Sequence, residues 1–234
     1  MKVPILLPNI FNHPFTYESS NLNLKIGDYV IVPFGKSKIT GVVWNEFEKD
    51  KKKKYLIKKV IQKLKIPSLK INTIKFLNWF SEYNMVPKGM TLKLLLLSSN
   101  VVEKFPEKNY LIYKGKLKGN NIKLSQKQKQ SLEKMNISND KFRVHVLQGT
   151  TGSGKTMVYF EALKQLITKG FQGLIMLPEI GLTGQFEKKF IEYFGFNPAI
   201  WHSGVTKKNK EIIWSGVANG EIRVVIGARS SLFL

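Results

Sequence analysis

The apolar residues of this 234-residue chain follow two different patterns. From Val3 to about Val60, short apolar runs are separated by turn residues, and two of them, Tyr29–Phe34 and Ile39–Trp44, flank a Gly-Lys-Ser-Lys turn. Short runs bounded by Gly and Pro predict strands joined in hairpins. We therefore expect the chain to begin with a small β-barrel or β-sheet domain.

Helical spacing follows this β pattern. Within Ile71–Asn84, the apolar residues Ile74, Leu77, Phe80 and Tyr83 recur at every third position, which predicts a helix. A second helix is expected over Pro87–Leu97. The next segment, Val101–Lys123, contains glycines and asparagines that are typical of an irregular connector.

From Ser125 onward, strand-like and helix-like segments alternate. Ser125 and Gln128 stand at the two positions of a capping box, which predicts a helix from there to about Met135. The further expected elements are strand Arg143–Leu147, helix Thr156–Lys169 ending at Gly170, strand Gly173–Leu177, helix Gln185–Phe194, strand Ala199–Trp201, helix Lys207–Ala218 and strand Ile222–Ile226. Such alternation predicts a parallel sheet of βαβ units. The expected fold class is α/β, preceded by a β-rich domain.

The charge of the chain indicates what kind of partner it binds. There are 38 Lys and Arg residues against 16 Asp and Glu residues, which gives a net charge of +22. This excess favours a polyanion such as nucleic acid, because each Lys–phosphate contact releases counterions. An AT-rich genome would also produce a lysine-rich chain, so charge alone does not decide. The run Lys49–Lys54 is expected to be a solvated loop.

Composition excludes several other classes. No apolar run approaches the roughly 18 residues of a membrane span, and no signal-peptide pattern is present. The absence of cysteine excludes disulfides and thiolate zinc sites, and His13, His145 and His202 lack ligand spacing. His202 could touch DNA or a partner lobe, and a structural histidine at a strand end is the alternative. We expect a soluble, cytoplasmic protein without a membrane partner.

The segment Gly149–Thr156 matches the phosphate-binding pattern G-x-x-x-x-G-K-[ST], and it lies between a predicted strand and a predicted helix. Glycines allow successive backbone N–H groups to converge on phosphate oxygens at a helix N-terminus. Lys155 is expected to meet the β- and γ-phosphates of ATP, and the Thr156 hydroxyl to bind Mg²⁺. The predicted ATP-binding residues of this loop are Gly149, Thr150, Thr151, Gly152, Ser153, Gly154, Lys155 and Thr156.

Two later segments follow strands, where open α/β sheets bind ligands. Leu177–Gln185 opens a helix that Thr183 can cap, and its amides could hold a DNA phosphate. An ordinary strand–turn–helix connection is the alternative. Val225–Phe233 places Arg229 and Ser230 just past the carboxyl end of a strand.

Four motifs, in order, together resemble the primosomal replication-restart helicases, the PriA or primosomal protein N′ family. They read GTTGSGKT, LPEIGLTGQ, WHS and GARSSLF, and the resemblance covers Leu124–Leu234. It implies a superfamily-2, RecA-like first motor lobe with Gln128 near the adenine of ATP. The residues that it places along the DNA path are Thr183, Gln185, Arg229 and Ser230.

The N-terminal half resembles the 3′-end-binding domain of the same family. The matching strings are Pro14–Tyr17, Val32–Lys36, Gly41–Val43 and Ile57–Val60. The resemblance implies that a DNA 3′ end meets an aromatic face, a close backbone approach and a phosphate contact, supplied by Phe15, Tyr17, Gly35 and Lys58. The family's usual Phe-Asp-Tyr is Phe-Thr-Tyr here, and core packing of the two aromatic residues is the alternative.

The resemblance divides the chain into a 3′-end DNA-binding domain (1–98), a linker in place of most of the family's winged-helix domain (99–123) and a first RecA-like lobe (124–234). The Walker B carboxylates and the arginine finger are expected beyond residue 234, so no catalytic residue is assigned. ATP- and DNA-binding elements without a complete hydrolytic site are therefore expected.

The implied function is ATP-dependent 3′-to-5′ unwinding and primosome assembly at stalled forks, in DNA replication, repair and recombination. The implied cofactors are ATP and Mg²⁺, and full-length members also bind zinc through cysteines that this chain lacks. The implied partners are forked DNA with a single-strand/duplex junction and a 3′ end, other primosome proteins and single-strand-binding protein.

Three other functions are compatible with parts of the sequence. A different superfamily-2 DNA translocase is disfavoured by the strings VPFGK and PFTY. A small-molecule P-loop kinase is disfavoured by the basic excess and by the lack of a lid or acceptor-site signature. A fork-DNA-binding module with a vestigial nucleotide site stays open.

Overall fold

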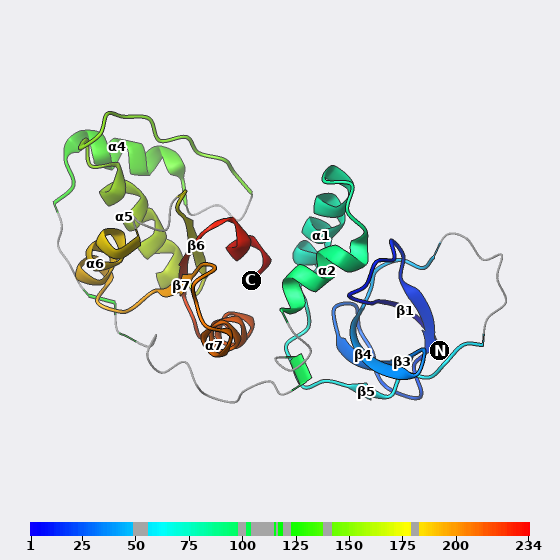
Figure 1. The fold of residues 1–234 in the computed structure, drawn as a ribbon. Helices are drawn as coiled ribbons and strands as arrows, with labels where there is room; N and C mark the ends of the chain where they lie inside the picture. Colours follow the sequence, from blue (N-terminus) through cyan, green and yellow to red (C-terminus); the bar gives the residue numbers. More distant parts are fainter. Residues whose placement is uncertain are drawn as a thin grey trace. The chain divides into compact units, whose positions relative to one another are not determined.

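The computed structural model describes residues 1–48, 56–97, 102–103, 115, 117–118, 123–137, 142–178 and 183–234. The chain forms two compact units, residues 1–108 with 233–234 and residues 109–232 (Figure 1). The predicted lysine loop at Lys49–Lys54, most of the predicted connector and the middle of the Leu177–Gln185 segment lie outside the described residues.

A small antiparallel barrel forms most of the first unit. Its strands are β1 (Lys2–Leu6), β2 (Phe15–Glu18), β3 (Tyr29–Phe34), β4 (Ser37–Val43) and β5 (Gln62–Lys63), in the order β2-β1-β4-β3-β5. The chain before β5 closes this sheet on β2. The Val60 N–H donates to the Glu18 carbonyl at 2.9 Å, and the Glu18 N–H donates to the Lys58 carbonyl at 3.0 Å. Closure satisfies backbone groups that an open sheet would leave at its edges.

Alternate strand residues fill this barrel, as the period of a β-strand requires. The buried cluster consists of Val3, Ile5, Leu7, Tyr17, Val30, Val32, Val43 and Val60. The predicted β-rich domain is therefore confirmed, with its hairpin turn between β3 and β4 at the expected place.

A buried charge lies at the start of β3. Asp28 is only 1% exposed, and its carboxylate accepts hydrogen bonds from the Lys63 ammonium (2.6 Å), the Ser68 hydroxyl (2.6 Å) and the Lys25 backbone N–H (2.7 Å). Burial by itself raises the pKa of the Asp28 carboxyl, but these hydrogen bonds and the charge of Lys63 outweigh it, so the pKa lies below its usual value.

After the barrel, the described part of the first unit continues with the helices α1 (Ile71–Tyr83) and α2 (Lys88–Leu96). The N-terminus of α2 lies against the loop between β1 and β2. At Gly89 an added Cβ would be 2.4 Å from the Asn9 carbonyl oxygen, so this close approach requires glycine. From the connector, Val102 is buried and Glu103 accepts a hydrogen bond from the Thr40 hydroxyl at 2.8 Å.

The second unit contains a parallel sheet of β6 (Gly173–Met176), β7 (Ala199–Trp201) and β8 (Val224–Gly227), in the order β6-β8-β7. Its helices are α4 (Gln126–Met135), α5 (Lys155–Thr168), α6 (Thr183–Phe194), α7 (Lys207–Ala218) and the 3₁₀ helix η3 (Arg229–Phe233). The α/β class is confirmed. Helix α6 begins two residues before the predicted Gln185, and β8 lies slightly later than the predicted Ile222–Ile226.

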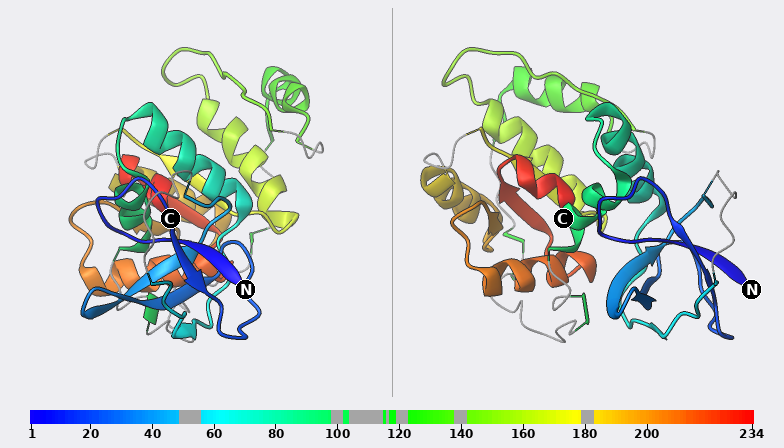
Figure 2. Two further views of the ribbon diagram at one scale, coloured as in Figure 1. Left: turned by 90° about the vertical axis from the view of Figure 1, so that its right-hand side faces the viewer. Right: turned by 45° about the vertical axis from the view of Figure 1, so that its right-hand side comes forward.

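Helices α5 and α6 lie on one face of this sheet (Figure 2). Aromatic side chains hold them there. Phe160 of α5 packs against Phe190 and Phe194 of α6, with ring centroids 5.8 Å and 5.2 Å apart. The same cluster includes Val224 and Ile226 of β8. The connections from β6 to β7 and from β7 back to β8 run in opposite directions, so right-handed crossovers place α7 on the other face.

One predicted element is wrong. Arg143–Leu147, expected to be a strand, has no regular secondary structure, and the side chains of Val144 and Val146 are 76% and 89% exposed. An apolar run becomes a strand only when its N–H and C=O groups pair with a neighbour. Among the described residues, this segment has no such neighbour, whereas β6, β7 and β8 pair with one another.

Candidate nucleotide- and DNA-binding sites

Gln128 connects helix α4 to the phosphate-binding loop. Its side-chain oxygen accepts from the Ser125 N–H at 2.8 Å, and the Ser125 hydroxyl accepts from the Gln128 N–H at 3.3 Å, so the predicted capping box is confirmed. The Gln128 side-chain amide also donates to the Gly154 carbonyl at 3.3 Å. The oxygen and the nitrogen of the Gln128 side-chain amide are therefore both hydrogen-bonded to backbone groups, one at Ser125 and one at Gly154.

The glycines of the loop have the backbone geometry that the motif requires. Gly152 and Gly154 have φ angles of +82° and +80°, in the left-handed region that favours glycine. A Cβ on Gly154 would also lie 2.3 Å from the Gln128 side-chain nitrogen. Gly154 immediately precedes α5, so the loop amides lie at a helix N-terminus, where anions are stabilised.

Lys155 and Thr156 begin α5 and face the loop. The Lys155 ammonium donates to the carbonyl oxygens of Gly149 and Thr150, each at 2.7 Å. The Thr156 hydroxyl oxygen accepts from the Tyr159 hydroxyl at 3.3 Å. The ammonium is thus held over the loop by two backbone oxygens.

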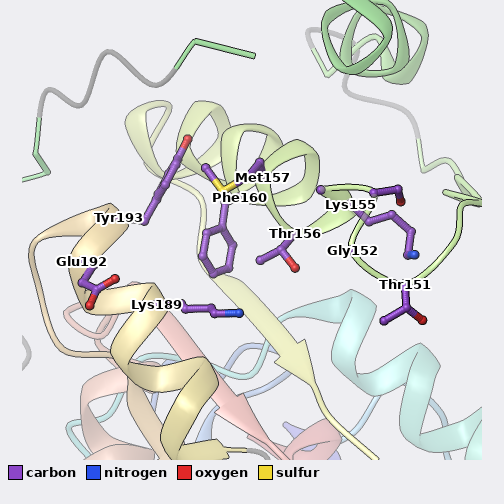
Figure 3. Close-up of a pocket in the computed structure, with 11 residues that line it drawn as sticks. Thr151, Gly152, Lys155, Thr156, Met157, Phe160, Lys189, Glu192 and Tyr193 are labelled. Atoms are coloured by element: carbon purple, nitrogen blue, oxygen red, sulfur yellow. The ribbon is translucent and has the colours of Figure 1, made fainter. Parts of the chain in front are cut away.

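A cavity of about 760 Å³ opens beside this loop, between α5 and α6 (Figure 3). The loop residues Thr151–Thr156 form one wall, and Lys189 and Tyr193 of α6 lie on the other. Sequence reasoning missed these two residues because they belong to no motif and reach the loop only through the packing of α6. The Tyr193 hydroxyl donates to the Glu161 carboxylate, and burial together with this carboxylate raises the pKa of Tyr193.

The residues predicted to line a DNA path lie at the carboxyl end of the parallel sheet. Arg229 and Ser230 are exposed in η3, directly after β8, and Gln185 is exposed in the first turn of α6. The Thr183 side chain is outside the described part of the chain. His202 follows β7 at this end, and its Nδ1 accepts from the Gly204 N–H at 3.1 Å, which also fits a structural role.

In the first unit, the four residues predicted at the DNA 3′ end converge on one turn. The Tyr17 hydroxyl donates to the Pro33 carbonyl at 3.1 Å, and the Lys58 ammonium donates to the Gly35 carbonyl at 3.3 Å. Phe15 packs edge-on against Phe34, with centroids 5.3 Å apart.

These four residues differ in exposure. Tyr17 is 4% exposed and belongs to the barrel core, whereas Lys58 and Gly35 are exposed and Phe15 is half-buried. Gly35 has φ +60° and open space where a Cβ would lie. The turn thus offers a cation, an accessible backbone and an aromatic ring in one place, with Tyr17 supporting them from inside.

Two further features limit the chemistry of the described residues. His, Asp and Glu side chains there form no group of three or more that could hold a metal ion. None of the helices in the described ranges is long and apolar enough to cross a bilayer.

The chain combines an antiparallel β-barrel, which has an exposed lysine beside an aromatic ring, with a parallel-sheet unit whose loop matches the phosphate-binding motif. This combination is typical of proteins that bind nucleotides and nucleic acids. Comparisons with known families agree. Residues 2–96 match the PriA 3′ DNA-binding domain (3′BD), and residues 121–234 match the family described as type III restriction enzyme, res subunit.

Similarity to individual proteins shows which family within this class the chain belongs to. The chain is 39% identical over 236 residues to the replication restart protein PriA of Rickettsia conorii, and 41% identical over 235 residues to that of Rickettsia felis. Each match covers 98% of this chain and 35% of the relative. The PriA protein of Bacillus subtilis is 32% identical over 147 residues, covering 61% of this chain and 18% of that protein. The chain belongs to the PriA family of replication restart proteins and spans about a third of the length of these rickettsial relatives.

Proposed function

We propose that this chain is the DNA-binding and first motor portion of an ATP-dependent 3′-to-5′ DNA helicase that restarts replication at stalled forks. The observation that carries the proposal is the loop at Gly154–Thr156, which has phosphate-binding geometry and is joined in one chain to a 3′BD-type barrel. Primosome proteins and single-strand-binding protein are the partners that this role implies.

We propose that successive parts of the chain have different roles. We assign 3′-end DNA binding to residues 1–98, a linker to 99–123 and the first RecA-like lobe to 124–234. The two compact units and the separate family matches support this division. The boundary between the compact units falls near residue 108, inside the proposed linker.

In the nucleotide site, the chain's own residues bind and orient the phosphates of ATP. Backbone N–H groups from Gly149 to Thr156 would hold the phosphate oxygens, and the Lys155 ammonium would leave its carbonyl partners for the β- and γ-phosphates. The Thr156 hydroxyl would hold Mg²⁺, which neutralises phosphate charge. The link from Gln128 to Gly154 connects the expected adenine contact with the phosphate loop.

In the DNA site, Lys58 would contact a phosphate near the 3′ end, Phe15 would stack on a base, and the exposed Gly35 backbone would approach the terminal sugar. In the motor unit, Thr183, Gln185, Arg229 and Ser230 would follow the single strand. Arg229 is suited to a phosphate, because its guanidinium can donate two hydrogen bonds at once.

A coupling experiment tests the proposal. The 234-residue chain is titrated into a labelled fork with a 3′-hydroxyl leading strand, with and without a non-hydrolysable ATP analogue and Mg²⁺. The motor interpretation predicts that nucleotide changes the fork affinity and that Lys155→Ala abolishes this change, while Lys208→Ala, at an exposed position of α7, does not. Equal affinity with and without nucleotide would instead favour the fork-binding module with a vestigial nucleotide site.

A further inference from the structure

Four rings lie together beside the β3–β4 turn, and two of them belong to no motif. Phe11, His13, Phe15 and Phe34 form this group, which we call the aromatic shelf. Phe15 lies at its centre, with ring centroids 4.9 Å from His13, 5.3 Å from Phe11 and 5.3 Å from Phe34. We propose that the aromatic shelf stacks the base of the nucleotide next to the 3′-terminal one, as a second base-binding position for single-stranded DNA.

The outer part of the aromatic shelf is open to a ligand. Phe11 is 40% exposed and the His13 side chain 35% exposed, in contrast to Tyr17, which is 4% exposed inside the barrel. Aromatic faces that remain accessible beside a basic turn are what single-strand-binding proteins use, because every base offers a π-face. The shelf therefore extends the proposed 3′-end site outward from Phe15.

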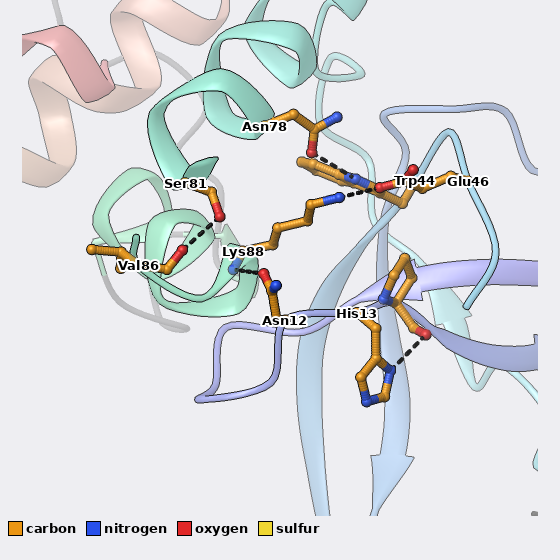
Figure 4. A network of polar contacts seen from close by, with 9 residues as sticks. Asn12, His13, Trp44, Glu46, Asn78, Ser81, Val86 and Lys88 are labelled. Atoms are coloured by element: carbon orange, nitrogen blue, oxygen red, sulfur yellow. Dashed lines mark hydrogen bonds and ion pairs between the residues drawn. The ribbon is translucent and has the colours of Figure 1, made fainter. Parts of the chain in front are cut away.

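There is also room for a base beside His13. A cavity of about 340 Å³ borders it, lined by Asn12, Glu46, Glu48 and Lys88 among others. These side chains offer donors and acceptors to the edge of a base. The negative charge of Glu46 is paired with the Lys88 ammonium (Figure 4). The Glu48 carboxylate lies 3.6 Å from His13 Nδ1.

The loop that carries Phe11 and His13 is held in place before any ligand arrives. The Asn9 side-chain oxygen accepts from the Phe11 N–H at 3.0 Å, and the Phe11 carbonyl accepts from the Gly89 N–H at 3.1 Å. The Asn12 side-chain oxygen accepts from the Lys88 N–H at 3.0 Å (Figure 4). Because α2 fixes this loop, the rings need no costly ordering when a base binds.

Continuity with the β3–β4 turn identifies DNA as the occupant. Phe34 directly precedes Gly35, whose carbonyl accepts from Lys58, and the exposed Lys36 and Lys38 follow on the same turn. A strand whose end lies at Gly35 and Lys58 would therefore carry its next base toward the rings and its phosphates past the lysines. The inference rests on the proposed 3′-end binding of this unit.

The test compares two labelled single strands with a 3′-hydroxyl end, one intact and one with an abasic spacer at the second nucleotide from the end. Fluorescence anisotropy is measured with the full chain, with Phe11→Leu, which keeps apolar packing but removes the ring, and with His13→Ala. Wild type is expected to bind the abasic strand about tenfold more weakly. Each variant should lose affinity for the intact strand and bind the abasic strand like wild type. Ile10→Ala is the matched control, since its side chain is exposed outside the shelf.

Equal affinity of wild type for the intact and the abasic strand would overturn the proposal. An equal loss of affinity for both strands in Phe11→Leu and His13→Ala would overturn it as well. Each strand is also tested with a 3′-phosphate. Wild type could still prefer a 3′-hydroxyl and depend on Lys58 while binding the intact and abasic strands equally. That result would contradict only the proposed stacking on the aromatic shelf. If wild type shows no preference for a 3′-hydroxyl, the proposed 3′-end binding fails first.

Discussion

The ammonium of Lys58 donates a hydrogen bond to the carbonyl oxygen of Gly35 at 3.3 Å, across 23 positions of sequence. Lys58 lies in the segment that closes the barrel on β2, and Gly35 lies in the β3–β4 turn. Barrel closure is therefore what brings the cation to the turn. Both groups are exposed, so a phosphate can take the place of the carbonyl without unfolding any part of the barrel.

Lys58→Ala is expected to weaken binding of single strands with a 3′ end. Loss of one phosphate contact lowers the slope of log affinity against log salt by about 0.7 for single strands. Lys59→Ala changes an exposed neighbour that lies outside the site and serves as the control. The measurement is anisotropy over a series of salt concentrations. Indistinguishable slopes for the two variants would remove Lys58 from the site.

Gly154→Ala is expected to disrupt the phosphate-binding loop for two separate reasons. A non-glycine residue at φ +80° costs about 1–2 kcal/mol, and its Cβ would also displace the Gln128 amide. Gly170→Ala has nearly the same backbone strain, at φ +86°, but nothing lies within 4 Å of the added Cβ. Both variants should therefore lose thermal stability, and only Gly154→Ala should lose nucleotide affinity. Normal nucleotide affinity in Gly154→Ala would show that neither the backbone conformation of Gly154 nor its contact with Gln128 is needed for nucleotide binding.

Asp28 makes the barrel sensitive to acid. Its pKa is lowered in the folded state, so its stabilising effect is complete above the ordinary carboxyl value of 3.8 and is lost as pH falls through the lowered folded-state pKa. Asp28→Ala leaves three donors without their acceptor, and we expect it to lower the free energy of unfolding by about 2 kcal/mol at neutral pH.

The Asp28→Ala variant should also lose the part of the acid dependence that lies below pH 3.8. Urea unfolding, followed by tryptophan fluorescence across the acid range, measures both effects. A variant that is as stable as wild type at neutral pH, with the same acid dependence, would show that the buried carboxylate does not stabilise the barrel.

The segment before the phosphate loop is expected to exchange its amide hydrogens quickly. Residues 142–148 have no regular secondary structure, whereas β8 is paired on both sides, with β6 and with β7. Hydrogen exchange followed by mass spectrometry should therefore show early labelling of 142–148 and late labelling of Val224–Gly227. Equal protection of the two segments would mean that Arg143–Leu147 forms the strand predicted from its pattern.

Short-range features could be predicted because the two interacting residues lie only a few positions apart in the sequence. Ser125 and Gln128 are three positions apart, so their capping box follows from helix geometry. The position of the glycine-rich loop at the N-terminus of a helix follows from the motif in the same way. The helices and most strands were likewise placed to within a few residues by their apolar spacing.

Contacts between distant segments could not be predicted from local pattern. No motif shows that Lys189 of α6 lines the cavity beside the phosphate-binding loop, and only the family resemblance placed Lys58 with Gly35, because both contacts depend on how whole elements pack. The error at Arg143–Leu147 has the same origin. Its alternating apolar residues indicate a strand, but strand formation depends on a neighbour elsewhere in the chain.

The most direct test of the nucleotide site is a titration of the folded 234-residue chain with a fluorescent ATP analogue in the presence of Mg²⁺. We predict saturable, Mg²⁺-dependent binding, which Lys155→Ala weakens by about tenfold or more through loss of charge-assisted hydrogen bonds to phosphate. Lys208→Ala should bind like wild type. No saturable binding by the wild-type chain, or equal binding by Lys155→Ala, would contradict the assignment of Gly149–Thr156 as an ATP site.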